Sequence, residues 1–355
     1  MDGVYYVIFS HSGGYNYLHR QVCRKFRNLI PQVDSLLYFD TLLADGKTFS
    51  FKPKINLVND AAKGNYFNIL IWCKSKGVFD KKLCEFAAER GNLSLLQWAR
   101  ANGYHWNATT CSLAARGGHL KILKYLRTNG CPWNEWTCAS AARGGHLKIL
   151  KYLRTNGCPW DVRTCSQAAY GGHLEVLQWA RSQGCPWDEN TCDFASEAKD
   201  DYKTLIWARI NGCPCTETVC TDIARGGNLD MLKWARANGC PWNRSLTRLC
   251  AMGKGNLEML QWARANGCPW DETLCSMAAL CGNLQVLQWA RANGCPWNED
   301  TFTEAAFHGD ISTLQWLKDN GCLYDREQCL LAAQQRENAD VIEWIQKELC
   351  DLESS

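Results

Sequence analysis

The segment AARGGHLKILKYLRTNGCPW occurs twice without change, at residues 114–133 and again at residues 141–160. Its Cys-Pro ending returns at intervals of 27 or 28 residues, with the cysteine at Cys131, Cys158, Cys185, Cys213, Cys240, Cys268 and Cys295. A fixed period of this length indicates a repeat array, because a unit so short cannot bury its own apolar face and must pack against its neighbours. Most of the 355-residue chain is therefore predicted to form one array of repeats.

Each unit predicts two short helices. The first runs from a Thr-Cys pair through small residues to a glycine, which stops it. The second, as at residues 174–182, carries leucines on one face, ends at Gly184 and cannot continue through Pro186. About eleven units follow the period, beginning near Asn56, Leu83, Thr110, Thr137, Thr164, Thr191, Val219, Thr247, Leu274, Thr301 and Gln328. The predicted fold is an all-α helix-turn-helix solenoid with little or no β-structure.

Two recurring polar positions are predicted to cap these helices. The Asn or Asp that follows the tryptophan, as at Asn134 and Asp161, precedes the next first helix. His119, His146 and His173 precede second helices, and other units carry a capping residue type at the same place: Asn92, Asn228, Asn256, Asn283 and Asp310. We therefore predict that the histidine position caps the second helix and is not a metal ligand.

The unit resembles the ankyrin repeat, whose pattern runs TPLHxAAxxGHLEVVxxLLxxGADVN. Residues 172–178 read GHLEVLQ, residues 130–134 read GCPWN, and the resemblance extends over residues 56–350. The ankyrin unit has about 33 residues, so the shorter unit of this chain lacks the loop that forms the projecting hairpin. The resemblance implies a non-enzymatic protein-interaction scaffold, with the first helices and the turns as the binding face.

The 22 cysteines and 17 tryptophans are interpreted as packing residues. Tyr104 replaces a loop cysteine, and Cys215 and Tyr324 replace tryptophans, which packing tolerates but metal coordination does not. No Cys-x-x-Cys pair occurs, and Cys213-Pro-Cys215 stands alone. We expect no metal, no cofactor and no catalytic residue, while a cysteine-based metal or redox protein remains the third hypothesis.

Positions that differ from unit to unit are the candidates for partner binding. They lie at the end of the first helix and in the turn after the tryptophan: Arg116, Arg143, Tyr170, Arg225, Phe307, Trp136, Arg163 and Arg244. The alternative is neutral drift on a solvated surface.

Charge is unevenly distributed although the net charge is only +3. Residues 110–163 carry nine Lys or Arg and two acids, and residues 164–218 carry four basic and eight acidic residues. A basic stripe is predicted on the second helices, formed by Lys121, Lys124, Lys148 and Lys151. It is either a solvated face produced by duplication or a surface for an acidic partner, and nucleic acid is not expected because no known module accompanies it.

Residues 1–38 depart from the period and resemble a degenerate F-box, whose pattern runs IFSYL, a spacer, then LxxVCRxWRxLI. The matching residues are Ile8, Phe9, Val22, Cys23, Phe26, Leu29 and Ile30. An F-box implies docking on a Skp-type adaptor of a cullin ubiquitin ligase, with the repeats holding the substrate. The combination resembles proteins of large DNA viruses of protists. The opening Leu-Pro-x-Glu element of the F-box is absent, and the alternative is a helical cap on the solenoid.

The predicted organisation is an F-box-like helical module at 1–38, a linker at 39–55 and the solenoid at 56–355, with 328–355 as its C-terminal cap. The sequence lacks the HExxH, GxxxxGK[ST] and GxSxG motifs. We expect a monomeric, non-enzymatic scaffold with protein partners: an adaptor that recruits substrates to a ligase, or else a passive binding or structural repeat protein. No apolar run is long enough to span a bilayer and the first residues lack a secretory pattern, so we expect it in the cytoplasm, that of the host if it is viral.

Overall fold

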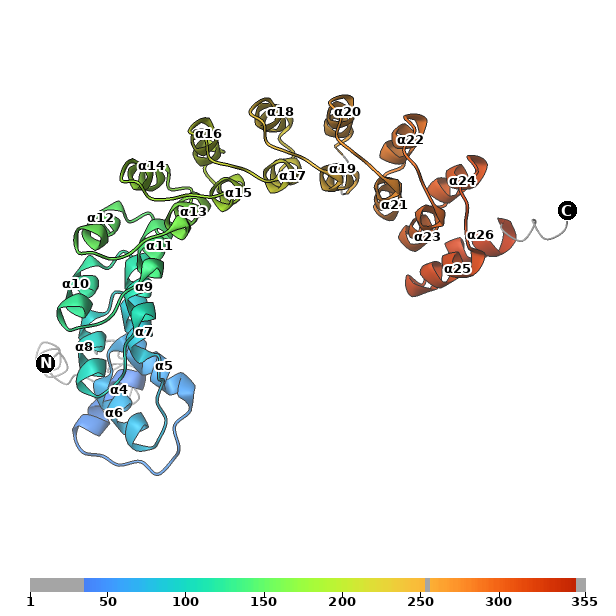
Figure 1. The fold of residues 1–355 in the computed structure, drawn as a ribbon. Helices are drawn as coiled ribbons and strands as arrows, with labels where there is room; N and C mark the ends of the chain where they lie inside the picture. Colours follow the sequence, from blue (N-terminus) through green and yellow to red (C-terminus); the bar gives the residue numbers. More distant parts are fainter. Residues whose placement is uncertain (1–34, 253–255, 349–355) are drawn as a thin grey trace, which may run out of the picture. The chain divides into compact units, whose positions relative to one another are not determined.

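The computed structural model describes residues 35–252 and 256–348. All regular secondary structure in these two ranges is helical, which confirms the predicted all-α fold (Figure 1). The seven residues of the F-box-like motif, from Ile8 to Ile30, lie outside the described residues.

The chain divides into two units. Unit 1 comprises residues 1–168 and 175–185, and unit 2 comprises residues 169–174 and 186–355. The helices of unit 1 are α4 (Ser35–Ala44), α5 (Ile55–Gly64), α6 (Phe67–Ser75), α7 (Leu83–Glu89), α8 (Leu93–Ala101), α9 (Ala108–Arg116), α10 (Leu120–Thr128), α11 (Glu135–Arg143) and α12 (Leu147–Thr155), and most of α13 (Val162–Tyr170) and α14 (Leu174–Ser182).

Unit 2 repeats the same helix pair. Its helices are α15 (Asn190–Ser196), α16 (Lys203–Ile210), α17 (Glu217–Arg225), α18 (Leu229–Ala237), α19 (Arg244–Ala251), α20 (Leu257–Ala265), α21 (Glu272–Leu280), α22 (Leu284–Ala292), α23 (Glu299–His308), α24 (Ile311–Asp319), α25 (Arg326–Gln335) and α26 (Ala339–Glu348). Within each unit the first helices of the pairs lie side by side in one row, and the second helices form another row (Figure 1). From α5 to α26 the described chain forms eleven successive pairs.

The first helix of a pair begins with a reciprocal capping arrangement. The Asn107 side chain accepts a hydrogen bond from the Thr110 N–H at 3.2 Å, and the Asn107 N–H donates to the Thr110 hydroxyl at 3.2 Å. The prediction that the residue after the tryptophan position caps the first helix is therefore confirmed here. The buried Thr110 completes this capping box, and in the next pair the Asn134 N–H likewise donates to the Thr137 hydroxyl at 3.4 Å.

The second helix ends at a glycine in the left-handed conformation. Gly184 has φ +78°, and the Cys185 N–H reaches back to the Ala180 carbonyl at 3.0 Å. This is the Schellman arrangement, in which the residue after the glycine satisfies a carbonyl that the helix leaves without a partner. The predicted helix stop is confirmed, and Cys185 takes part in it through its backbone.

The core lies between the two rows of helices. Small residues such as Ala114 and Ala115 are fully buried where first helices approach one another, and leucines of the second helix such as Leu123 and Leu126 are fully buried against them. Removing one such leucine side chain costs about 2–5 kcal/mol, because the close-packed surroundings collapse only in part.

The segment expected to be a linker at 39–55 is partly helical. The α4 helix continues to Ala44, and Asp40 accepts hydrogen bonds from the Asn68 side chain and the Ile69 N–H, both at 2.9 Å. The Ile69 N–H belongs to the first turn of α6, which needs an acceptor that Tyr66, its N-cap residue, does not supply. Asp40 therefore caps α6 from another helix.

Candidate functional site

The loop cysteines are buried donors of weak hydrogen bonds. The Cys131 thiol lies 3.3 Å from the Asn107 carbonyl oxygen, and the Cys158 thiol lies 3.4 Å from that of Asn134. In each case the acceptor belongs to the N-cap of the first helix of the same pair. All seven loop cysteines are fully buried, so their predicted packing role is confirmed.

Burial also suppresses the reactivity of several cysteine thiols, in the turns and at the starts of first helices. It raises the pKa of Cys84 to about 11 and the pKa values of Cys268 and Cys322 to about 12. The thiolate is the nucleophile and the metal ligand, so thiols that remain protonated at neutral pH perform neither role well. Within the described ranges, no group of three or more His, Cys, Asp or Glu side chains is arranged to hold a metal ion.

The tryptophans of the Cys-Pro-Trp turns are half-buried on the row of second helices. The Trp160 ring meets the Trp179 ring of the next second helix edge to face, with centroids 6.0 Å apart. The Arg154 guanidinium lies 4.1 Å from the Trp160 centroid and donates to the Cys158 carbonyl at 2.5 Å. An arginine on one face and a ring edge on the other leave part of each indole in water.

This arrangement recurs in both units, and we call it the tryptophan ladder. Its edge-to-face pairs join a turn tryptophan to the aromatic residue of the following second helix: Trp133–Tyr152 and Trp160–Trp179 in unit 1, and Trp187–Trp207, Trp242–Trp262, Trp270–Trp289 and Trp297–Trp316 in unit 2. Such pairs and the cation–π contacts each contribute about 0.5–1.5 kcal/mol. The ladder therefore stabilises each junction between neighbouring pairs.

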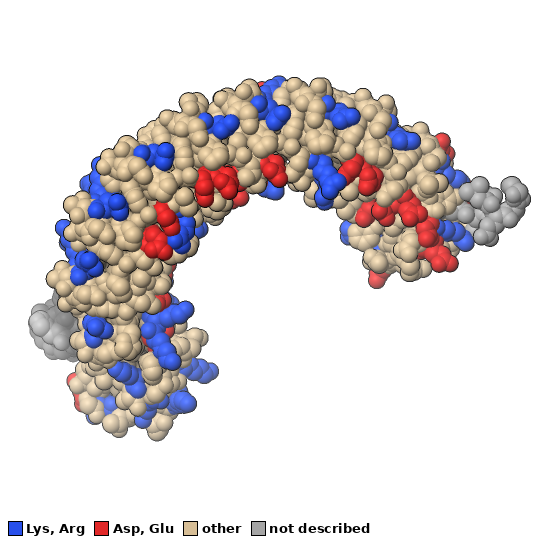
Figure 2. Space-filling model, viewed as in Figure 1, with Lys and Arg blue, Asp and Glu red and all other residues tan. Residues whose placement is uncertain are grey.

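The four lysines of the predicted basic stripe are exposed on α10 and α12. Figure 2 shows Lys and Arg atoms on the surface over these second helices. The ammonium groups of Lys124 and Lys151 lie 5.8 Å from the ring centroids of Tyr152 and Trp179 respectively. A hollow of about 480 Å³ adjoins them, lined by Lys151, Arg154, Thr155, Trp160, Trp179 and Gln183. Positive charge and aromatic surface thus lie together in unit 1.

The histidine position behaves differently from the prediction. Asn92 accepts a hydrogen bond from the Leu95 N–H at 3.0 Å, as a capping residue should. His119 and His146 stand at the same helix position but make no side-chain cap. The His146 Nε2 atom lies instead 2.9 Å from the Arg116 carbonyl oxygen at the end of an earlier first helix. The asparagines cap, whereas these two histidines link adjacent pairs.

Among the predicted partner-binding residues of unit 1, two lie together. Trp136 is 46% exposed at the start of α11, and the Arg163 guanidinium lies 4.5 Å from its ring centroid. Arg163 also forms ion pairs with Glu135 at 3.0 Å and Asp161 at 2.5 Å. Arg116 and Arg143 are exposed at the last turns of α9 and α11.

The predicted residues of unit 2 are more dispersed. Tyr170 is 41% exposed and packs edge to face on Phe194, with centroids 5.7 Å apart. Arg225 is paired with Asp222 on its own helix, and Arg244 with Asp271 at 2.8 Å. The eight candidates therefore do not form one site but occupy the row of first helices in both units.

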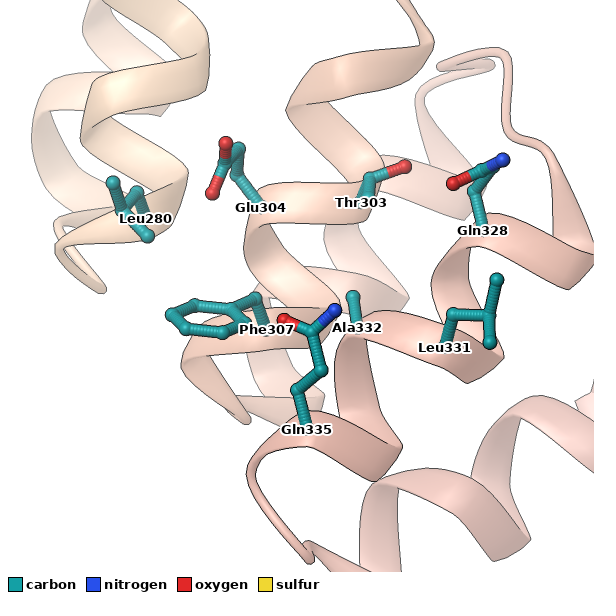
Figure 3. Close-up of a pocket in the computed structure, with 8 residues that line it drawn as sticks. All are labelled: Leu280, Thr303, Glu304, Phe307, Gln328, Leu331, Ala332 and Gln335. Atoms are coloured by element: carbon teal, nitrogen blue, oxygen red, sulfur yellow. The ribbon is translucent and has the colours of Figure 1, made fainter.

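Phe307 lies in a hollow that the sequence did not reveal (Figure 3). The hollow measures about 460 Å³ and is lined by Leu280, Thr303, Glu304, Phe307, Gln328, Leu331, Ala332 and Gln335. All eight residues come from three neighbouring first helices, α21, α23 and α25. Burial, followed by the charge of Asp300, raises the pKa of the Glu304 carboxyl. The missed signal was Leu331, which is 53% exposed on a helix that the sequence marked only as part of an end cap.

Across the described chain, every helix is too short or too polar to serve as a membrane span.

Comparisons with known proteins bear on the fold. A family model described as ankyrin repeats (many copies) matches residues 84–127, which extend from α7 to α10. Comparison with curated protein sequences gave no significant match. Among solved structures, the pentatricopeptide repeat protein PPR10 from maize is 16% identical with a TM-score of 0.42, over 94% of this chain and 57% of that one.

A second structure, PPR10 in complex with an 18-nt psaJ RNA element, is 13% identical with a TM-score of 0.34, over 88% of this chain and 61% of that one. The chain thus spans about three fifths of the length of these two proteins. The match at residues 84–127, together with the helix pairs repeated before and after it, supports an ankyrin-like repeat architecture for this chain.

Proposed function

We propose that the chain is a non-enzymatic scaffold that binds other proteins. The observation that carries this proposal is that, within each unit, the recurring residues and the variable residues have different structural roles. The residues that recur from unit to unit, such as Thr110, Gly184 and Cys185, cap helices, stop helices or fill the core. The residues that vary, such as Trp136 and Phe307, lie on the row of first helices. Recurring scaffold residues combined with variable surface residues suit recognition of a partner.

The more specific proposal is an adaptor that recruits substrates to a cullin-type ubiquitin ligase. Support comes from the F-box-like residues, among them Val22, Phe26 and Ile30, placed before a set of repeats suited to substrate binding. Such a protein would act in the cytoplasm, as a monomer with protein partners and without binding nucleic acid. The resemblance to proteins of large DNA viruses of protists would make it the cytoplasm of a host cell.

A pull-down of a purified Skp-type adaptor tests the ligase proposal. The full chain is compared with a Phe26→Asp, Ile30→Asp variant, and equal thermal melting of the two chains serves as the control for folding. Adaptor bound by the first and not by the second is the expected result. No adaptor bound by either chain would reject the ligase role and leave the passive binding scaffold, with the N-terminal segment as its cap.

The cysteine-based metal or redox hypothesis is the weaker alternative, because burial keeps thiols such as Cys268 protonated. Elemental analysis of the purified chain tests it: zinc or iron in stoichiometric amount would restore it.

A further inference from the structure

We propose that the hollow formed by α21, α23 and α25 in unit 2 is the docking site for a basic amphipathic protein segment, which inserts apolar side chains between Phe307 and Leu331. The proposal rests on the proposed function as a protein-binding scaffold, and it assigns that function a place and a partner chemistry.

The apolar part of the site is formed by side chains from all three helices. Leu280 ends α21, Phe307 lies near the end of α23, and Leu331 lies in the middle of α25. In Figure 3 Ala332 lies between Phe307 and Leu331, and the Gln335 side chain reaches toward Phe307. A volume of about 460 Å³ falls within the range of roughly 300–1,000 Å³ that is usual for binding pockets.

Exposure of this apolar surface has a cost that a partner would remove. Leu331 is 53% exposed although leucine is among the residues most often buried, and Phe307 is only half-buried. The Arg336 guanidinium lies 4.6 Å from the Phe307 centroid and covers one face of the ring. Covering an apolar patch that already has a concave centre is favourable by about 25 cal/mol for each Å² removed from water.

The charge around the hollow selects the partner. The helices α21, α23 and α25 carry five carboxylates and a single Lys or Arg, Arg326, and Arg336 follows α25 directly; the acids are Glu272, Glu299, Asp300, Glu304 and Glu327. Four of the five lie in the first turn of their helices. Acidic side chains gather over these first helices in Figure 2.

The two features are arranged side by side. The carboxylates form a band along the starts of the three helices, whereas Leu280, Phe307 and Gln335 lie toward their ends. Glu304 stands between the two parts, one turn before Phe307 on α23 and inside the lining of the hollow. A segment that crosses the three helices would therefore need Lys or Arg on one edge and apolar side chains on the other, which is the pattern of an amphipathic segment.

The charged band also predicts how the segment binds. Carboxylates on the rim of an interface mainly accelerate association and exclude partners of like charge. The buried apolar contact determines how long the complex lasts. Binding should therefore weaken as salt is added, yet depend chiefly on Leu331 and Phe307.

The test starts from a random peptide library selected on the immobilised full chain. Selected peptides are then labelled, and their binding is measured by fluorescence anisotropy at two salt concentrations. The expected result is a set of sequences with Lys or Arg beside leucine or aromatic residues. We expect binding to weaken at least tenfold in a Leu331→Lys chain, and two- to fivefold in a Glu304→Gln chain.

A Leu323→Lys chain is the matched control, because Leu323 is 76% exposed in unit 2 but does not line the hollow. It introduces the same charge and should bind like the unaltered chain. Light scattering is carried out on all chains in parallel.

The other outcomes separate this proposal from the proposed function. Peptides that lack basic residues, or that bind the Leu331→Lys chain equally well, would overturn the docking site while the scaffold function stands. A dimer that the Leu331→Lys change converts to a monomer would show that a second copy fills the hollow, which also overturns the proposal. Selection of no peptide at all would count against the docking site and against the scaffold function together.

Discussion

Replacing Trp160 by alanine measures what one rung of the tryptophan ladder contributes. The side chain is half-buried, so roughly 100 Å² of apolar surface is returned to water, equivalent to about 2.5 kcal/mol. The edge-to-face contact with Trp179 adds about 1 kcal/mol and the Arg154 contact about 0.7 kcal/mol. Residual burial in the unfolded chain reduces this total, so we expect a loss of about 3 kcal/mol in the free energy of unfolding.

The assay is urea unfolding followed by far-ultraviolet circular dichroism, because fluorescence would combine 17 tryptophans. Trp136→Ala is the matched control: this indole is 46% exposed, lies outside the ladder, and should cost less than about 1 kcal/mol. Equal losses for the two variants, or a loss below about 1 kcal/mol for Trp160→Ala, would refute the ladder as a source of stability. A loss of 5 kcal/mol or more would show that the ring is enclosed and not half-buried.

Three further predictions concern single positions. Gly184→Ala should lower the free energy of unfolding by about 1–2 kcal/mol and Gly184→Asn by less, as measured by the same urea titration, because φ is +78° and no atom lies within 4 Å of an added Cβ. Oxidised glutathione should link Cys215 to Cys240, whose sulfur atoms lie 3.0 Å apart, in two thiol exchanges that release two glutathione thiols. Burial raises the pKa of Cys240, so the reaction should accelerate as pH rises, and mass spectrometry that finds no such link would contradict this. Glu304→Gln should leave the chain as stable or slightly more stable at pH 7, since the raised pKa means that folding disfavours the ionised carboxyl. In the unaltered chain the protonated Glu304 stabilises the fold at acid pH, and this stabilisation is lost as pH rises through the folded-state pKa. Melting temperatures of the two chains that converge at acid pH would support the prediction, and a variant less stable than the unaltered chain at pH 7 would contradict it.

Much of the fold could be predicted because all units share one sequence pattern, so the helix pair inferred for one unit applies to the others. The period defined the helix pairs, and the positions of Gly184 and Pro186 gave the end of the second helix. The capping box of Asn107 and Thr110 was only half predicted. The sequence suggests that Asn107 caps the helix, but it does not show which hydroxyl accepts the hydrogen bond from the Asn107 N–H.

The environment of the tryptophans was predicted only in part. The sequence indicated that they pack, but it does not show that the contacts of Trp160 come from Arg154 and from a ring nineteen residues later. The candidate site was predicted in part. Unit-to-unit variation pointed to Phe307, but Leu331 belongs to the last pair, which has no later copy to show that its leucine is unusual.

The turn contacts also have a consequence for how such a chain can grow. The Cys158 thiol contacts a residue of its own pair, and the ring contacts of Trp160 join its own pair to the next one. A duplicated unit of one period would therefore keep all the contacts within its own helix pair. At both of its junctions it would contact the same side chains that the original unit contacts. Under these conditions, an inserted copy should fold without compensating changes elsewhere. The identical sequences at residues 114–133 and 141–160 are consistent with a gene that lengthens by duplication of whole units. Each duplication adds new surface residues, which can then diverge and change what the protein recognises.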